Sequence, residues 1–114
     1  MLSERAKAAL RHILVNIELA ESFAKHVIAK QFVDDDLRIY ATTRALEIIS
    51  EASRRLPEDL KARYPAVPWR QIAAAGNIYR HGYDVAAAEV LWQTVQTGLA
   101  ELRQATEAEL ARTD

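Results

Sequence analysis

Four side chains that could act together on a phosphate ester lie close together near the middle of the chain: Asn77, Arg80, His81 and Tyr83. An imidazole titrates near neutral pH and can donate or accept a proton, and a guanidinium pairs with phosphate oxygens. The amide and the phenol add further hydrogen-bonding groups. This combination suits an anionic ligand, above all a phosphate, that undergoes acid–base chemistry.

A helix is predicted over Trp69–Tyr83, because Pro68 precedes it and three consecutive alanines follow its start. On this helix Gly76 shares one face with the amide, the guanidinium and the imidazole, since residues three and four apart are neighbours. Gly82 lets the backbone turn and can bring the phenol of Tyr83 beside the imidazole. A histidine near a helix end is also often only a C-terminal cap, so this simpler interpretation stays open.

The composition bounds the fold that must position these groups. The 114 residues make one domain, and half of them are hydrophobic while only three are Gly and three are Pro. This favours an all-α protein, and the pattern predicts an up-and-down bundle of four principal helices plus a short helical turn. With no Cys, no membrane-length apolar run and no signal peptide, we expect a cytoplasmic protein without disulfides, thiolate metal sites or membrane contact.

Apolar residues at three- and four-residue steps place the principal helices. The first is predicted from about Ser3 to Ile28 and the second from about Asp35 to Leu56, with Leu37 at the start of its apolar stripe. The last is predicted to begin after an Asp84 cap. Its apolar face holds Ala88, Leu91, Trp92, Val95, Leu99 and Leu102, and its polar tail, Glu107 to Asp114, is expected to fray.

Three shorter segments connect these helices. Lys30 to Val33 is predicted to be a connection, Glu58 to Arg63 a short helical turn, and Tyr64 to Pro68 extended, because proline disfavours α conformation in the residue before it. Trp69 is expected to pack as a core aromatic at this corner and not as a base-stacking platform. His12 and His26 are too far apart for one metal site and are expected at the surface.

The charge is unevenly distributed although the net charge is only −1. From Arg54 to His81 there are six Lys and Arg residues against two acids, so an RNA-sized ligand belongs to this part of the chain. Arg54 and Arg70 are the candidate RNA- or phosphate-binding residues in this basic stretch outside the central cluster. For any single one of these charges, a solvated helix surface is the simpler interpretation.

Several segments, taken in order, cover nearly the whole chain and carry a resemblance. They are the 13–23 region, Arg44–Ala52, Arg55–Leu60, Val67–Ile72, His81–Tyr83 and Glu89–Trp92. Their order and spacing resemble the HepT-like toxins, the ribonuclease partners in HepT/MntA toxin–antitoxin pairs of the HEPN superfamily. The resemblance implies an all-helical homodimer that cuts RNA without a metal or other cofactor. It also implies an MntA-like nucleotidyltransferase antitoxin that adds AMP to a tyrosine.

The family motif has an arginine, a polar residue and then His-x-Tyr. Carried over, Asn77 is the polar residue, His81 the histidine, and Tyr83 the AMP acceptor. The sequence departs from the motif at Gly76, where the arginine is expected. Arg80 lies one helical turn further, about 6 Å along the helix, and can supply the positive charge from there.

Two functions therefore compete on the sequence. In the first, His81 acts as acid or base and Arg80 stabilises the pentacovalent phosphate, so that the chain is a metal-independent endoribonuclease toxin. In the second, favoured by Gly76, the chain is a non-catalytic helical dimer that binds a nucleotidyltransferase as a scaffold or substrate-binding subunit. The sequence does not indicate which RNA would be cut.

Overall fold

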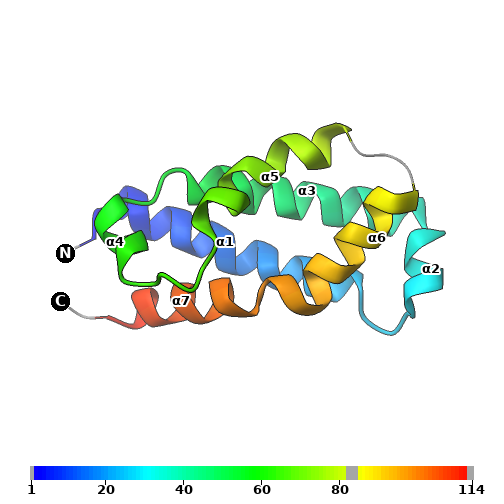
Figure 1. The fold of residues 1–114 in the computed structure, drawn as a ribbon. Coiled ribbons are helices and arrows are strands. Elements are labelled where there is room, and N and C mark those ends of the chain that lie inside the picture. Colours follow the sequence, from blue (N-terminus) through cyan, green and yellow to red (C-terminus); the bar gives the residue numbers. More distant parts are fainter. Residues whose placement is uncertain (1, 82–84, 113–114) are drawn as a thin grey trace.

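The computed structural model describes residues 2–81 and 85–112, and the side chains of these residues apart from those at 77–81 and 85–86. The described residues form seven α-helices and one π-helical segment, η1 (Figure 1). These are α1 Glu4–Phe23, α2 Ala29–Val33, α3 Asp36–Ser53, α4 Glu58–Ala62, α5 Trp69–His81, α6 Val85–Gln93, η1 Thr94–Gly98 and α7 Ala100–Ala111. The predicted all-α fold is confirmed. The described residues include two short helices, α2 and α4, whereas the sequence predicted one short helical turn.

The long helices pack as a bundle in which α3 occupies a central position. It packs against α1 on one side and α5 on another, and α1 also packs on α7. Figure 1 shows α5 lying along α3 and running in the opposite direction. The core side chains come mainly from α1, α3 and the α6–α7 segment, among them Leu10, Ile13, Ile17, Leu46, Ile49, Leu91 and Leu102. In the described part of the chain, no helix is long and apolar enough to cross a bilayer.

The first two long helices begin with side-chain caps, but α1 ends earlier than predicted. Ser3 accepts a hydrogen bond from the backbone of Ala6, and Asp35 accepts one from Arg38 at the start of α3. The first helix ends at Phe23 and not at Ile28, since the chain leaves the helix and reaches a positive φ of 63° at His26. His12 and His26 are both exposed, as predicted.

The prediction that Lys30 to Val33 is a connection is wrong, because these residues belong to α2. Phe32 is fully buried there, and its ring lies 5.3 Å from that of Trp92 in α6. A five-residue helix is too short to show apolar periodicity, so the sequence pattern gave no sign of it.

The second helix ends at Ser53 and not at Leu56, and its inward face differs from the predicted stripe. Leu46 and Ile49, which were expected to broaden that stripe, are each 2% exposed, whereas Leu37, expected at its start, is 79% exposed. The buried face is turned by about a quarter of a helical turn from the predicted one. Because α1 and α5 both pack on α3, its buried surface is wider than a single stripe.

The corner before α5 is a turn and not the predicted extended segment, because the Val67 amide donates to the Tyr64 carbonyl at 3.1 Å. The short helical turn after Pro57 is confirmed as α4. Trp69 packs against the core, and its indole N–H donates to the carbonyls of Lys61 and Tyr64, each at 3.1 Å. These bonds tie the start of α5 to the end of α4.

The predicted last helix is divided into α6 and α7 by η1. Its polar tail was predicted to fray, but within the described residues it stays helical to Ala111. Glu109 holds it in place: its side chain is 1% exposed, and one oxygen accepts from Arg63 (2.9 Å), Tyr64 (2.9 Å) and Arg112 (3.1 Å). The hydrogen bond from Arg63 lowers the pKa of Glu109, and burial raises the pKa of Tyr64. This cluster anchors α7 to the turn that precedes α5.

A candidate nucleic-acid cleavage site along α5

The helix α5 lies close against α3 at Gly76, which is buried. Its N–H donates to Ser50 Oγ at 3.2 Å. A Cβ at position 76 would lie 2.9 Å from that oxygen and 3.4 Å from Ser50 Cβ. A contact below 3.0 Å forces a neighbour to move, so a side chain at position 76, where the family motif has arginine, would displace the Ser50 hydroxyl.

A guanidinium from α3 lies at the same place. Arg54 Nη1 donates to the carbonyl of Ala73 at 2.6 Å and to Ser50 Oγ at 3.3 Å, and Ser50 Oγ itself donates to the Ala73 carbonyl at 3.0 Å. The same nitrogen lies 4.0 Å from where a Cβ at position 76 would be. Among the described residues, no partner contacts Nε or Nη2 of Arg54. The positive charge is thus held against α5 by the Ala73 carbonyl and the Ser50 hydroxyl.

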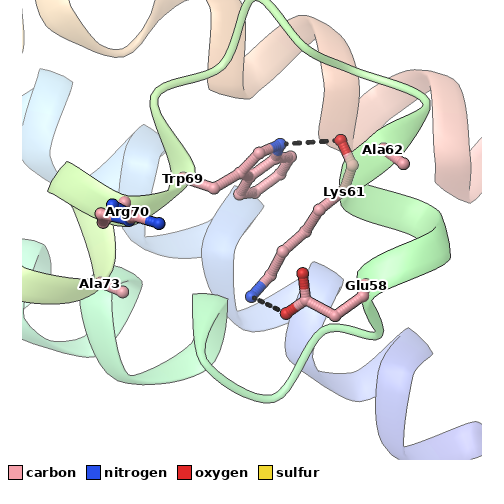
Figure 2. Close-up of a pocket in the computed structure, with 6 residues that line it drawn as sticks. All are labelled: Glu58, Lys61, Ala62, Trp69, Arg70 and Ala73. Carbon is pink, nitrogen blue, oxygen red and sulfur yellow. Dashed lines mark hydrogen bonds and ion pairs between the residues drawn. The ribbon is translucent and has the colours of Figure 1, made fainter.

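Beside this network lies a pocket of about 480 Å³, between α4 and the start of α5. Figure 2 shows its lining side chains, which are Glu58, Lys61, Ala62, Trp69, Arg70 and Ala73. Lys61 Nζ lies 3.6 Å from a Glu58 oxygen, and the Lys61 side chain is 15% exposed while that of Glu58 is 92% exposed. Arg70 is exposed in the first turn of α5. The pocket therefore combines an indole with two cations and one acid.

The helical register connects this pocket to the predicted catalytic positions. Arg70, Ala73, Asn77 and His81 follow one another at steps of three, four and four residues, so these positions lie along one face of α5. Position 76 lies on the neighbouring face, packed against α3, and position 80 is one turn further on it. The pocket and the motif thus lie along one side of a single helix, roughly 11 Å apart from centre to centre.

The structure places the predicted site residues unequally. Asn77, Arg80 and His81 lie in the last turns of α5, but their side chains are outside the described part of the structure, as is the whole of Tyr83. Their proposed roles stay predictions. Arg54 of α3 is held against α5 by its bonds to Ser50 and to the Ala73 carbonyl. Arg70 lies in the first turn of α5 and lines the pocket together with Ala73.

Sequence reasoning missed Ser50 and Lys61, which shape this region. A serine within α3, four residues before Arg54, was the available signal, together with a glycine in the middle of α5. Neither indicates a helix–helix contact until the two helices are placed side by side. Among the side chains that the structure describes, no three from His, Cys, Asp or Glu are grouped as a metal site would require.

Basic side chains along one helix of an all-helical bundle can bind an anionic polymer. Comparison with known proteins shows the family to which the chain belongs. Residues 13–109 match the family model described as "Ribonuclease HepT-like". The chain therefore belongs to the HepT-like ribonuclease family, as the resemblance predicted.

Two named relatives agree with this assignment. "Probable ribonuclease HepT" of Thermococcus cleftensis is 37% identical over 97 residues, which cover 85% of this chain and 88% of the relative. A Methanocaldococcus jannaschii protein whose name assigns it as an RNase is 32% identical over 107 residues, covering 94% and 98%. No solved structure gives a significant match.

Proposed function

We propose that the protein is an RNA-cleaving toxin of a toxin–antitoxin pair that works without a metal ion. The observation that carries this is the match of residues 13–109 to the HepT-like ribonuclease family. Cleavage of this kind needs the 2′-hydroxyl deprotonated, the pentacovalent phosphate stabilised and the leaving 5′-oxygen protonated. The residues along α5 can divide these tasks.

His81 is the proposed acid or base, because an imidazole exchanges protons near neutral pH. Arg80 stabilises the charge that develops on the phosphate, and Asn77 orients the imidazole or binds a phosphate oxygen. Arg54 supports this proposal, since its guanidinium is held against the helix one turn before these positions. Arg54 and Arg70 bind RNA phosphates on the side of the cleaved bond that lies along the first turns of α5.

The proposed control acts on Tyr83. An MntA-like nucleotidyltransferase antitoxin adds AMP to its hydroxyl, which places a phosphodiester and a bulky nucleotide where RNA must bind. The added negative charge competes for Arg80, and the nucleotide blocks access to His81. Because the acceptor belongs to the same His-x-Tyr motif as His81, modification and catalysis exclude one another.

The active form is proposed to be a homodimer whose interface includes α5, so that two copies supply opposed groups to one phosphate. Part of the small-residue run on α5 serves a different purpose, because Gly76 packs inside the protomer against Ser50. Ala74 is exposed and stays available for an interface. A monomeric mass by light scattering at micromolar concentration would refute the dimer.

The experiment that tests catalysis compares the wild type with His81→Ala on structured and unstructured RNA in excess EDTA. His12→Ala is the matched control, because His12 is an exposed histidine on α1. We expect the wild type and the control to cleave, and His81→Ala to lose roughly 10²- to 10⁴-fold in rate. A wild type that binds its nucleotidyltransferase but cleaves no RNA would support the scaffold alternative, which the glycine at position 76 favours.

A further inference from the structure

We propose that the pocket between α4 and α5 is a nucleotide-binding subsite, which holds one unpaired nucleotide of the RNA flanking the cleaved bond. This inference rests on the proposed ribonuclease function and extends it to substrate recognition. The occupant is a single-stranded nucleotide, whose base contacts the Trp69 indole while its phosphate lies between Arg70 and Lys61.

The lining chemistry matches the two parts of a nucleotide. Single-stranded nucleic acids bind where aromatic side chains meet a positively charged groove, because every base has a face that stacks on a ring. Trp69 and Ala73 offer apolar surface, and Arg70 and Lys61 provide charge on the same opening (Figure 2). The volume of about 480 Å³ lies within the range of small-ligand pockets.

The indole is fixed in place before any ligand binds. Its N–H bonds to the carbonyls of Lys61 and Tyr64 hold Trp69 at the junction of α4 and α5, so the ring contributes to the core and to the pocket at once. A ring held in this way loses little conformational freedom on binding. The sequence-based view of Trp69 as a core aromatic is thus correct but incomplete under this proposal.

The position of the pocket suits a nucleotide of the RNA strand that is cleaved. Arg70 and Ala73 precede Asn77 and His81 on one face of α5, and Arg54 is bonded to Ala73 between the two regions. A strand with its cleaved phosphate at the motif therefore passes Arg54 and reaches the pocket. No separate binding surface is needed.

Glu58 allows a test in which a substitution is expected to strengthen RNA binding. Its carboxylate lies 3.6 Å from Lys61 Nζ in the free protein and must give up this cation to an incoming phosphate. Because Glu58 is exposed at the rim, its removal should leave the fold intact. Glu58→Gln is therefore expected to tighten RNA binding, whereas Arg70→Ala is expected to weaken it.

The experiment measures binding of a non-cleavable 2′-O-methyl RNA by fluorescence anisotropy. Arg70→Ala is expected to raise Kd about tenfold, the usual effect of one lost charge-assisted hydrogen bond, and to lower the salt slope by about 0.7. Arg11→Ala, an exposed arginine on α1, is the matched control and should change neither. Ala62→Phe adds bulk to the pocket from the α4 side while every α5 residue stays unsubstituted, and it should weaken binding as well.

An abasic scan identifies the base. Removing bases one at a time from the RNA should weaken binding to the wild type at one position, and this penalty should disappear in Ala62→Phe. In Trp92→Phe, where Trp69 is the remaining tryptophan, the intact RNA should quench fluorescence and the abasic RNA should not.

Two results distinguish the inference from the function on which it rests. If the wild type cleaves RNA but Arg70→Ala, Ala62→Phe and every abasic position behave like the control, the subsite is refuted and the ribonuclease function stands. If the wild type neither binds nor cleaves RNA, both are refuted. Acidic protein segments that bind Arg70 and Lys61 with no need for an aromatic group would also contradict a nucleotide subsite.

Discussion

Replacing Gly76 by alanine tests the central packing feature of the site. The added Cβ would lie 2.9 Å from Ser50 Oγ and 3.4 Å from Ser50 Cβ, so the hydroxyl must rotate away. In doing so it gives up its bonds with the Ala73 carbonyl, the amide at position 76 and Arg54. The change should therefore affect stability and the placement of the guanidinium together.

Two opposing effects determine how much Gly76→Ala changes the free energy of unfolding. Alanine in a helix interior is favoured over glycine by about 1 kcal/mol. Displacing the Ser50 hydroxyl, which is 1% exposed, costs about 1–3 kcal/mol in lost hydrogen bonds and crowding. We therefore expect Gly76→Ala to lower the free energy of unfolding by about 1 kcal/mol, which corresponds to roughly 4 °C in Tm.

The assay is a double-mutant cycle with Ser50→Gly, measured by urea unfolding. Without the Ser50 side chain the new Cβ has room, so Gly76→Ala should become neutral or stabilising, with a coupling of about 1–2 kcal/mol between the two positions. RNA cleavage should fall in Gly76→Ala because Arg54 loses the hydroxyl that helps to hold it. Equal effects of Gly76→Ala in both backgrounds would refute the argument that Ser50 excludes a side chain at position 76.

Three further predictions concern catalysis, control and stability. Arg80→Ala should reduce cleavage by at least about 10²-fold and Arg80→Lys should recover only part of it, because lysine lacks the planar fork; wild-type rates in Arg80→Ala would assign the phosphate to another cation. Co-expression with the nucleotidyltransferase and ATP should add AMP to the wild type by intact mass but not to Tyr83→Phe, and an equal gain in both would exclude Tyr83 as the acceptor. Because the hydrogen bond from Arg63 lowers the pKa of Glu109, the ionised carboxylate stabilises the fold above its ordinary pKa, and this contribution is lost as pH falls through the lowered value. Glu109→Gln should thus be less stable than wild type at pH 7, by about 1–2 kcal/mol, and the difference measured by urea unfolding should close in acid; a constant difference would contradict the linkage.

The sequence predicted what depends on local pattern and failed where packing between distant segments decides. The helix starts near Ser3 and Asp35 and the helix after Pro68 follow from residue types and were found. The direction of the buried face of α3 depends on two neighbouring helices at once, so Leu37 was assigned to the core wrongly. Glu109 appeared to belong to a loose polar tail because its partners lie about 45 residues away in the chain.

The same distinction applies to the candidate site. Residue types alone identified Asn77, Arg80, His81 and Tyr83, since acid–base and phosphate chemistry require those groups in close spacing. Arg54 and Arg70 were identified only as members of a basic stretch. Their specific surroundings, the Ser50 network and the indole pocket, arise from α3 and α4 packing on α5, which no local pattern contains.

The glycine at position 76 links the departure from the family motif to the fold. An arginine there would have to leave α5 through the space that Ser50 fills, where α5 packs against α3. The fold instead holds a guanidinium from α3 against the same turn, with Nη1 bonded to the Ala73 carbonyl and to Ser50. Close packing of α5 on α3 and a positive charge beside position 76 are therefore compatible only if the charge comes from another residue. Gly76 and Arg54 are best understood as one arrangement, in which close packing of α5 on α3 and a guanidinium from α3 occupy the same turn.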